Sequence, residues 1–199
     1  MASNPLAKLT EEQYLAIERA AETKSEFVNG TMFSMSGASL RHALIGANLL
    51  GELHARLRGG GCRVITADLR VHVPATGLYT YPDATIVCGP PLLRDAHQDT
   101  LQNPSVIFEV LSPSTEGYDR GAKFQHYRTI TTLTDYVLVD QSKMRVEHFS
   151  RQTGETWTLH DTMRPEDELR IDSINVSLPL ALIYEGIAFD PMETVSVLA

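Results

Sequence analysis

The segment VIFEVL at residues 106–111 decides the fold, because it is a continuous apolar run interrupted by one carboxylate, Glu109. Runs of this kind are typical of strands buried on both faces of a sheet. Burying a carboxylate costs several kcal/mol unless a cation or good hydrogen-bond donors compensate it. Glu109 is therefore predicted to have a specific partner. The alternative is a glutamate at a strand end that reaches solvent or an arginine.

A second strand-like run, YTYPDATIV from Tyr79, contains Asp83 directly after Pro82. Because side chains alternate along a strand, Tyr79, Tyr81, Asp83, Thr85 and Val87 are expected to share one face. The segment before VIFEVL is long enough for the two strands to pair antiparallel. In that arrangement Asp83 and Glu109 converge and can share one divalent cation. The simpler interpretation of Asp83 is a turn or strand-start residue after proline.

Lys123 is the only lysine between Lys24 and Lys143, although arginine is used freely. A short helix is predicted at about residues 119–130, directly after the Glu109 strand, and would set Lys123 above the end of that strand. There an ammonium group can bind a phosphate oxygen or lower the pKa of an attacking water. The alternative is a solvated lysine paired with Asp119 one helical turn earlier.

The remaining pattern predicts one α/β (α+β) domain over residues 1–199, with its core at about 9–185. A capping box of Thr10 and Gln13 starts a helix at about 11–22, and Asn29-Gly30 closes a hairpin over 25–35. After a polar surface excursion at 89–103 and the VIFEVL strand, three strands beginning at 135, 145 and 155 form an antiparallel meander.

A longer helix at about 39–58 ends at three glycines. Its broad apolar side is predicted to contain Leu40, Leu44, Ala47, Leu50, Leu53 and Leu57.

Composition restricts the class of protein. The net charge of −8, with 17 Lys and Arg against 25 Asp and Glu, argues against a protein that coats nucleic acid. No apolar run approaches the length of a membrane span, and no secretion signal begins the chain, so a cytoplasmic protein is expected. Cys62 and Cys88 are expected to be reduced, partly buried thiols. His148 and His160 are interpreted as ordinary strand residues.

The runs FEVLSPSTEGYDRGAKFQHYRTI from Phe108 and YPDATIVCGP from Tyr81 resemble the Uma-type putative restriction endonuclease family, which is grouped with the PD-(D/E)XK nuclease superfamily. SEFVNGTMFSMSGASLRH and the YVLVD meander fit the same family, so the resemblance covers most of residues 9–185. It implies a restriction-endonuclease-like core, with a mixed central sheet flanked by helices.

The resemblance also implies site residues. Asp83 and Glu109 correspond to the two metal-binding acids, and Glu26 matches an acid that the superfamily supplies near its first helix. The superfamily lysine would fall at Leu111, but the family pattern puts it on the following helix, where this chain has Lys123. The backbone carbonyl of Val110 is a further implied metal ligand.

His42 also matches the family pattern, and both helix packing and catalysis stay open for it.

The sequence thus predicts an endonuclease that hydrolyses DNA phosphodiester bonds with Mg²⁺ or Mn²⁺. A homodimer is expected, because cleaving both strands of a duplex is simplest with two symmetric sites. The alternatives are a catalytically inactive nuclease-fold module for DNA binding or assembly, and hydrolysis of a smaller phosphoester at the same metal site.

Overall fold

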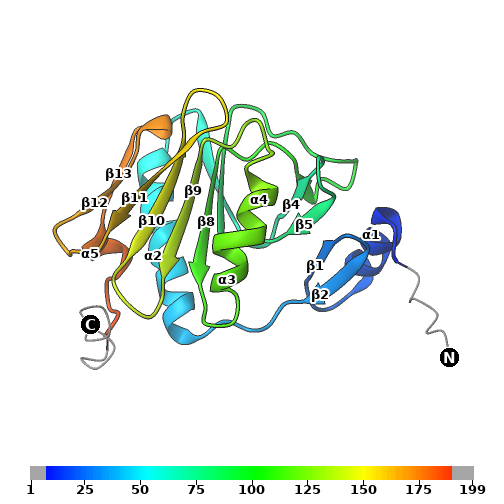
Figure 1. Ribbon diagram of the computed structural model, residues 1–199, viewed down its shortest axis with the longest axis horizontal. Helices are drawn as coiled ribbons and strands as arrows, with labels where there is room; N and C mark the ends of the chain where they lie inside the picture. Colours follow the sequence, from blue (N-terminus) through cyan, green and yellow to red (C-terminus); the bar gives the residue numbers. More distant parts are fainter. Residues whose placement is uncertain (1–7, 190–199) are drawn as a thin grey trace.

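A computed structural model describes residues 8–189 of the chain, so the two ends of the predicted domain, 1–7 and 190–199, lie outside the described residues. Its centre is a six-stranded sheet in the order β11-β10-β9-β8-β6-β3 (Figure 1). The strands are β3 (Cys62–Thr66), β6 (Ala84–Cys88), β8 (Val106–Leu111), β9 (Asp135–Asp140), β10 (Val146–Arg151) and β11 (Trp157–Thr162). β8 and β9 are parallel and the other neighbours antiparallel, so the predicted mixed central sheet is confirmed.

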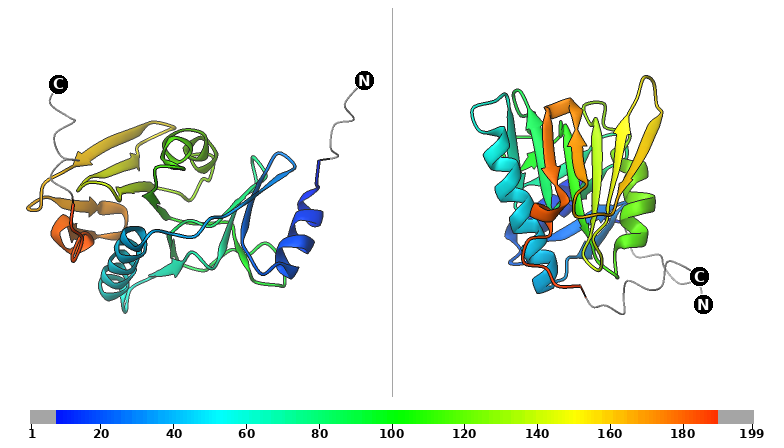
Figure 2. Two further views of the ribbon diagram at one scale, coloured as in Figure 1. Left: turned by 90° about the horizontal axis from the view of Figure 1, so that it is seen from below. Right: turned by 90° about the vertical axis from the view of Figure 1, so that its left-hand side faces the viewer.

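Helices cover both faces of this sheet (Figure 2). The long helix α2 (Leu40–Leu57) packs on the face that carries Val106, Phe108 and Val110. The opposite face, with Ile107 and Leu111, is covered by the crossover between β8 and β9. This crossover is a continuous helical segment made of α3 (Glu116–Tyr118), the π-helical turn η1 (Asp119–Lys123) and α4 (Phe124–Tyr127). By alternation Glu109 lies on this second face.

A second sheet, in the order β2-β1-β5-β4-β7, stands beside the first together with helix α1 (Glu11–Ala20). Its strands are β1 (Ser25–Val28), β2 (Thr31–Ser34), β4 (Arg70–Val73), β5 (Leu78–Thr80) and β7 (Thr100–Leu101). The predicted hairpin is confirmed, and its turn residues Asn29 and Gly30 have φ of 52° and 84°. The capping box of α1 is confirmed as well.

At the other end of the molecule a hairpin of β12 (Glu168–Ile171) and β13 (Val176–Pro179) packs beside α2 (Figure 1). The short helix η2 (Asp172–Ile174) joins the two strands, and α5 (Leu180–Ile183) follows them. No helix within residues 8–189 is long and apolar enough to cross a membrane.

The predicted strand over residues 79–87 is wrong as one element. It is split between β5 in the smaller sheet and β6 in the larger one, with residues 81–83 crossing between the sheets. Pro82 has no amide hydrogen to donate to a ladder, which favours a break at this point. The predicted antiparallel pairing with VIFEVL is confirmed, since Ala84 is opposite Phe108. The break leaves Asp83 directly before the first residue of β6, beside Glu109 on β8.

The predicted apolar side of the long helix is partly wrong. The buried row of α2 is Ile45, Leu49, Leu53 and Leu57, whereas Leu40 and Leu44 are 77% and 39% exposed. Successive residues are about 100° apart round a helix, so Leu44 and Ile45 belong to different sides. The leucines extend over a wider arc than the sheet covers, and the tertiary packing selects the row that is buried.

The prediction of reduced thiols is wrong in this structure, because Cys62 and Cys88 form a disulfide. The two residues are directly opposite each other on the antiparallel strands β3 and β6. This register follows from sheet pairing and is not visible in the spacing of the cysteines. The predicted surface excursion at 89–103 is also partly structured, because it contains β7, which pairs parallel with β4.

The buried row of α2 gives a direct test of the packing. Leu49→Ala removes a fully buried side chain and should lower the free energy of unfolding by about 2–5 kcal/mol. Leu40→Ala, the same substitution at an exposed position of the same helix, should change it by less than about 0.5 kcal/mol. Urea denaturation of both variants measures the difference, and equal losses would contradict the packing described here.

Candidate active site

Every predicted site residue lines one large cavity at the junction of the two sheets, with a volume of about 1260 Å³. β1 contributes Glu26, the crossing between the sheets contributes Asp83, β8 contributes Glu109 and Val110, and η1 contributes Lys123. These residues are distant in sequence, so the fold brings them together. The cavity is therefore the candidate active site.

Glu109 is buried, with 4% of its surface exposed, and its carboxylate has two partners on the crossover helix. The Lys123 ammonium lies 2.9 Å from Glu109 Oε1, and the Tyr127 hydroxyl donates a hydrogen bond of 2.8 Å to the same oxygen. The expectation that this carboxylate has a specific partner is confirmed, and the alternative of a solvent-reaching glutamate is wrong.

Lys123 is surrounded by carboxylates. Its ammonium lies 3.1 Å from Glu26 Oε1 and 3.4 Å from Asp119 Oδ1, in addition to Glu109. The pairing with Asp119 one turn earlier is thus present, but the solvated lysine of that alternative is not, since only 7% of the side chain is exposed. Both Asp119 and Lys123 belong to the π-helical turn η1, a distortion that occurs frequently at functional sites.

Asp83 lies on the neighbouring wall of the cavity. One of its carboxylate oxygens, Oδ2, accepts a 2.7 Å hydrogen bond from the amide of Val110, and His42 Nε2 is 3.4 Å from the same oxygen. The Asp83 side chain thus accepts a hydrogen bond from β8 just before β6 begins, where the backbone of residues 81–83 crosses between the two sheets. His42, whose role was open, contacts the site directly from the first turn of α2.

The electrostatics of the cluster follow from burial and charge. Burial raises the pKa of Glu109 to about 8, opposed by Lys123 and reinforced by the charges of Asp119, Asp83 and Glu26. Burial likewise raises the pKa of Asp119. For Lys123, burial acts to lower the pKa, but the surrounding carboxylates outweigh it and raise the pKa well above its usual value. The lysine is thus held in its charged form.

His42 is shifted by its neighbour. The hydrogen bond to Asp83 raises the pKa of His42, burial opposes this, and the Asp83 charge and the Val110 backbone add to it. The imidazole therefore favours its protonated form beside the carboxylate.

Two further residues complete the cluster and were not predicted as site residues. Tyr127 orients Glu109, and the hydroxyl of Thr80 on β5 donates to Glu26 Oε1. Tyr127 follows Lys123 by four residues, so helical spacing alone sets both on one side of the segment. Thr80 has no comparable signal, because its contact depends on how β5 lies beside β1.

The donor atoms fit a hard divalent cation in type, since carboxylate and carbonyl oxygens are the ligands that Mg²⁺ and Mn²⁺ prefer. Within residues 8–189, no three or more His, Cys, Asp or Glu side chains are grouped so that they could hold a metal ion. Mg²⁺ is usually bound by one or two carboxylates, with water and substrate phosphate supplying the rest. Asp83 and Glu109 supply two carboxylates to the same cavity.

A mixed sheet with helices on both faces, and buried carboxylates around a lysine beside it, defines a protein of the restriction-endonuclease-like class. The chain belongs to the Uma2 family, described as "Putative restriction endonuclease", whose model matches residues 11–182. The family expected from the sequence is thereby confirmed.

Two relatives are uncharacterized proteins of Synechocystis sp. One is 34% identical over 188 residues, covering 94% of this chain and 97% of the relative. The other is 34% identical over 168 residues, covering 84% of this chain and 95% of the relative.

A solved structure has the same fold. The crystal structure of a putative nuclease belonging to DUF820 from Anabaena variabilis superposes with a TM-score of 0.71 at 16% sequence identity. The match covers 88% of this chain and 97% of the other. The predicted fold class is confirmed by this likeness.

Removing the lysine should widen the pH range over which the fold loses stability. In Lys123→Met the carboxylates lose their counter-charge, and breaking a buried pair in this way costs about 3–5 kcal/mol. In wild type, where burial raises the pKa of Glu109 from 4.5 to about 8, this group destabilises the fold as pH rises from the lower value to the higher one. Loss of the lysine charge raises that pKa further, so the free energy of unfolding of the variant should fall further below wild type as pH rises above about 8.

Lys143→Met is the matched control, because Lys143 follows β9 and does not line the cavity. Its unfolding free energy should follow wild type across the same pH range. A loss in Lys123→Met that does not change with pH would contradict the charge compensation described for the cluster.

Proposed function

We propose that this chain is a nuclease that hydrolyses DNA phosphodiester bonds with Mg²⁺ or Mn²⁺ as its cofactor. The observation that carries the proposal is the convergence of Glu109, Asp83 and Lys123 on one cavity of a Uma2-family fold. These are the residue types that a metal-dependent nuclease requires, and the family description points to the same class.

Asp83 and Glu109 would hold the cation, with the Val110 carbonyl as a further ligand, whereas Glu26 contacts Lys123 and is not grouped with both acids around one ion. When bound, the cation would stabilise negative charge on the scissile phosphate and lower the pKa of an attacking water. Tyr127 keeps the Glu109 carboxylate oriented through a 2.8 Å hydrogen bond. Such buried support holds a ligand in one geometry.

Lys123 is proposed to bind a phosphate oxygen of the substrate. Its ammonium is charged and held by three carboxylates, so it is positioned before substrate arrives. The metal ion, when bound to Glu109, would weaken the attraction of that carboxylate for the Lys123 ammonium. The ammonium would then be free to contact a phosphate oxygen of the substrate. Lys123 is therefore a catalytic residue in this proposal.

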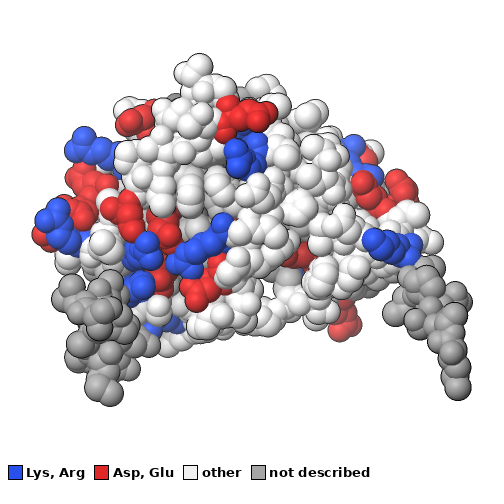
Figure 3. All heavy atoms as spheres, in the orientation of Figure 1, with Lys and Arg blue, Asp and Glu red and all other residues white. Residues whose placement is uncertain are grey.

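An acidic protein needs a local means of binding DNA. On the face shown in Figure 3, acidic and basic side chains are mixed toward the end with β12 and β13, with no continuous basic band among the described residues. The cavity itself adds Lys24 and Arg41 to Lys123 and His42. Several serine and threonine hydroxyls line it as well, and such hydroxyls contact DNA phosphates in many complexes.

The second candidate is a nuclease-fold module without catalysis that binds DNA or assembles with a partner. It is favoured by the ion pairs of Lys123, whose ammonium already contacts Glu26 and also Glu109, one of the two acids that would hold a metal. A homodimer is part of the leading proposal, as is a cytoplasmic location. A disulfide such as Cys62–Cys88 is more common in oxidising compartments than in the cytoplasm.

Cleavage of supercoiled plasmid with Mn²⁺ tests the enzyme proposal. Asp83→Asn and Glu109→Gln should each lower the rate by at least about 100-fold, the scale of losing one group that stabilises charge in the transition state. Their circular dichroism spectra should match wild type. The control Glu166→Gln changes an acid that is largely exposed, and its rate should equal wild type. Undiminished cleavage by Glu109→Gln would remove Glu109 from the site.

Calorimetric titration with Mn²⁺ separates the two candidates. Wild type and Glu166→Gln should bind the ion, and Glu109→Gln should bind it more weakly or not at all because a ligand is lost. Absence of binding by the wild-type protein, both alone and with a DNA oligonucleotide present, would favour the non-catalytic module.

A further inference from the structure

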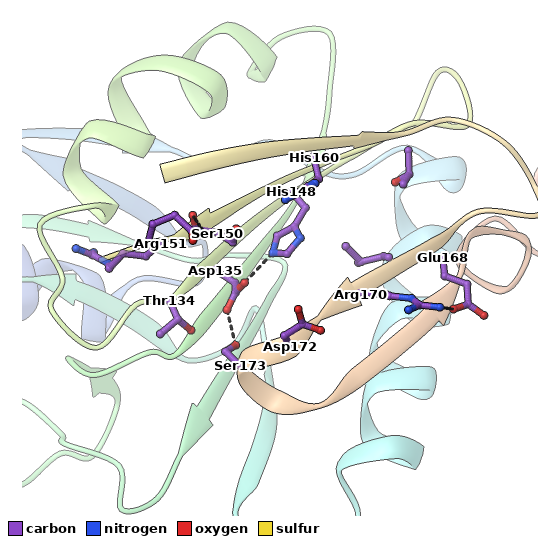
Figure 4. Close-up of a pocket in the computed structure, with 13 residues that line it drawn as sticks. Thr134, Asp135, His148, Ser150, Arg151, His160, Glu168, Arg170, Asp172 and Ser173 are labelled. Atoms are coloured by element: carbon purple, nitrogen blue, oxygen red, sulfur yellow. Dashed lines mark hydrogen bonds and ion pairs between the residues drawn. The ribbon is translucent and has the colours of Figure 1, made fainter. Parts of the chain in front are cut away.

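A second cavity, of about 580 Å³, is shown in Figure 4 and shares no lining residue with the candidate active site. It is lined by the start of β9, the middle and end of β10 and the second half of β11 on one side, and by β12 and η2 on the other. Val137, Val139 and Val146 form apolar core on this face of the sheet. By alternation Asp135 and His148 occupy the same face, where the core is replaced by polar groups.

His148 on β10 and His160 on β11 are neighbours on two adjacent strands that line this cavity. They are directly opposite in the antiparallel register of β10 and β11, and both line the cavity. Their ring centroids are 6.3 Å apart, with 37° between the ring planes. Side chains opposite each other in such a pair have Cβ atoms about 4.5–5.5 Å apart, so two imidazoles can reach one ion between them. The interpretation of both as ordinary strand residues misses this pairing.

The hydrogen bond with Asp135 determines which ring nitrogen of His148 carries the proton. Asp135 Oδ1 lies 2.7 Å from His148 Nε2, and Ser173 donates to the other carboxylate oxygen of Asp135, as the dashed lines in Figure 4 show. An Nε2–H donor satisfies this short contact with the carboxylate oxygen, which leaves Nδ1 with a free lone pair in the neutral imidazole.

This arrangement is that of a metal-binding histidine, whose second nitrogen is commonly hydrogen-bonded to a carboxylate. We propose that His148 Nδ1 and His160 bind one divalent transition-metal ion, such as Zn²⁺ or Ni²⁺, with water completing the coordination. The proposed protein ligands are two imidazoles only. The part of the chain that the structure describes has no group of three or more His, Cys, Asp or Glu side chains that could hold a metal ion.

The site differs in chemistry from the candidate active site. Imidazole nitrogen suits Zn²⁺, Ni²⁺ and Cu²⁺, whereas carboxylate and carbonyl oxygens suit Mg²⁺ and Mn²⁺. Glu168 and Arg170, which form an ion pair, also line the second cavity, as do Asp172 and Arg151. The lining thus carries charges of both signs, so the two imidazoles are the groups that select the ion. A bound ion would join the edge strand β11 to β10, so it would stabilise this end of the sheet. The proposal does not depend on nuclease activity.

Calorimetric titration of the untagged full-length protein with ZnCl₂, after removal of metals with a chelator, tests the site. Wild type should bind about one ion per chain, and its melting temperature should rise with added Zn²⁺. His160→Ala, at an exposed position, should fold normally and lose both effects. Asp135→Asn should weaken binding about 10–100-fold, the usual effect of removing such a partner.

Two controls separate the site from other cation binding. His54→Ala removes an exposed histidine of α2 outside both cavities, and Glu109→Gln changes the candidate active site. Both should bind Zn²⁺ as wild type does. The proposal is overturned if wild type binds no Zn²⁺, or if His160→Ala binds it as tightly as His54→Ala.

Discussion

The contact between the Glu109 carboxylate and the Lys123 ammonium is the interaction on which the rest of the structure depends. A strand as apolar as β8 holds a buried carboxylate only if a partner compensates its charge. The partner comes from the helical segment that immediately follows the strand, at 2.9 Å. The requirement that Lys123 reach Glu109 links the central strand to the crossover helix, and Glu26 links both to the smaller sheet.

The free-energy cost of burying the Glu109 and Lys123 side chains explains the polar groups around them. Three acids, Glu26, Glu109 and Asp119, surround one lysine, and Tyr127 and Thr80 supply further hydrogen bonds to two of them. A fold selected for stability alone would fill this space with apolar side chains, since replacing buried ion pairs in that way is often neutral or stabilising. The retention of several acids around a lysine is therefore best explained by chemistry at the cavity.

Much of the fold could be predicted because the local signals agree with the tertiary structure. The Asn29-Gly30 turn, the capping box before α1 and the VIFEVL strand each have a physical cause within a few residues. The errors occur where the outcome depends on distant segments. The break at Pro82 was not predicted, and the assignment of its two sides to different sheets depends on pairing partners. The buried row of α2 and the Cys62–Cys88 disulfide likewise depend on packing and register.

The candidate site shows the same division. Glu109 could be predicted because a carboxylate in an apolar strand is conspicuous, and Lys123 because the next helix follows so closely. Thr80 and the contact of His42 with Asp83 could not, since they arise from the meeting of two sheets and α2. The same limit applies to His148 and His160, whose opposition is set by a register that the sequence does not specify.

The most direct test of the central claim is a crystal of the protein grown with Mn²⁺ and examined at a wavelength where manganese scatters anomalously. We expect an anomalous peak between the carboxylates of Asp83 and Glu109, with Lys123 beside it. A well-ordered cavity that has no peak at saturating Mn²⁺, with the Lys123 ion pairs unchanged, would contradict the central claim.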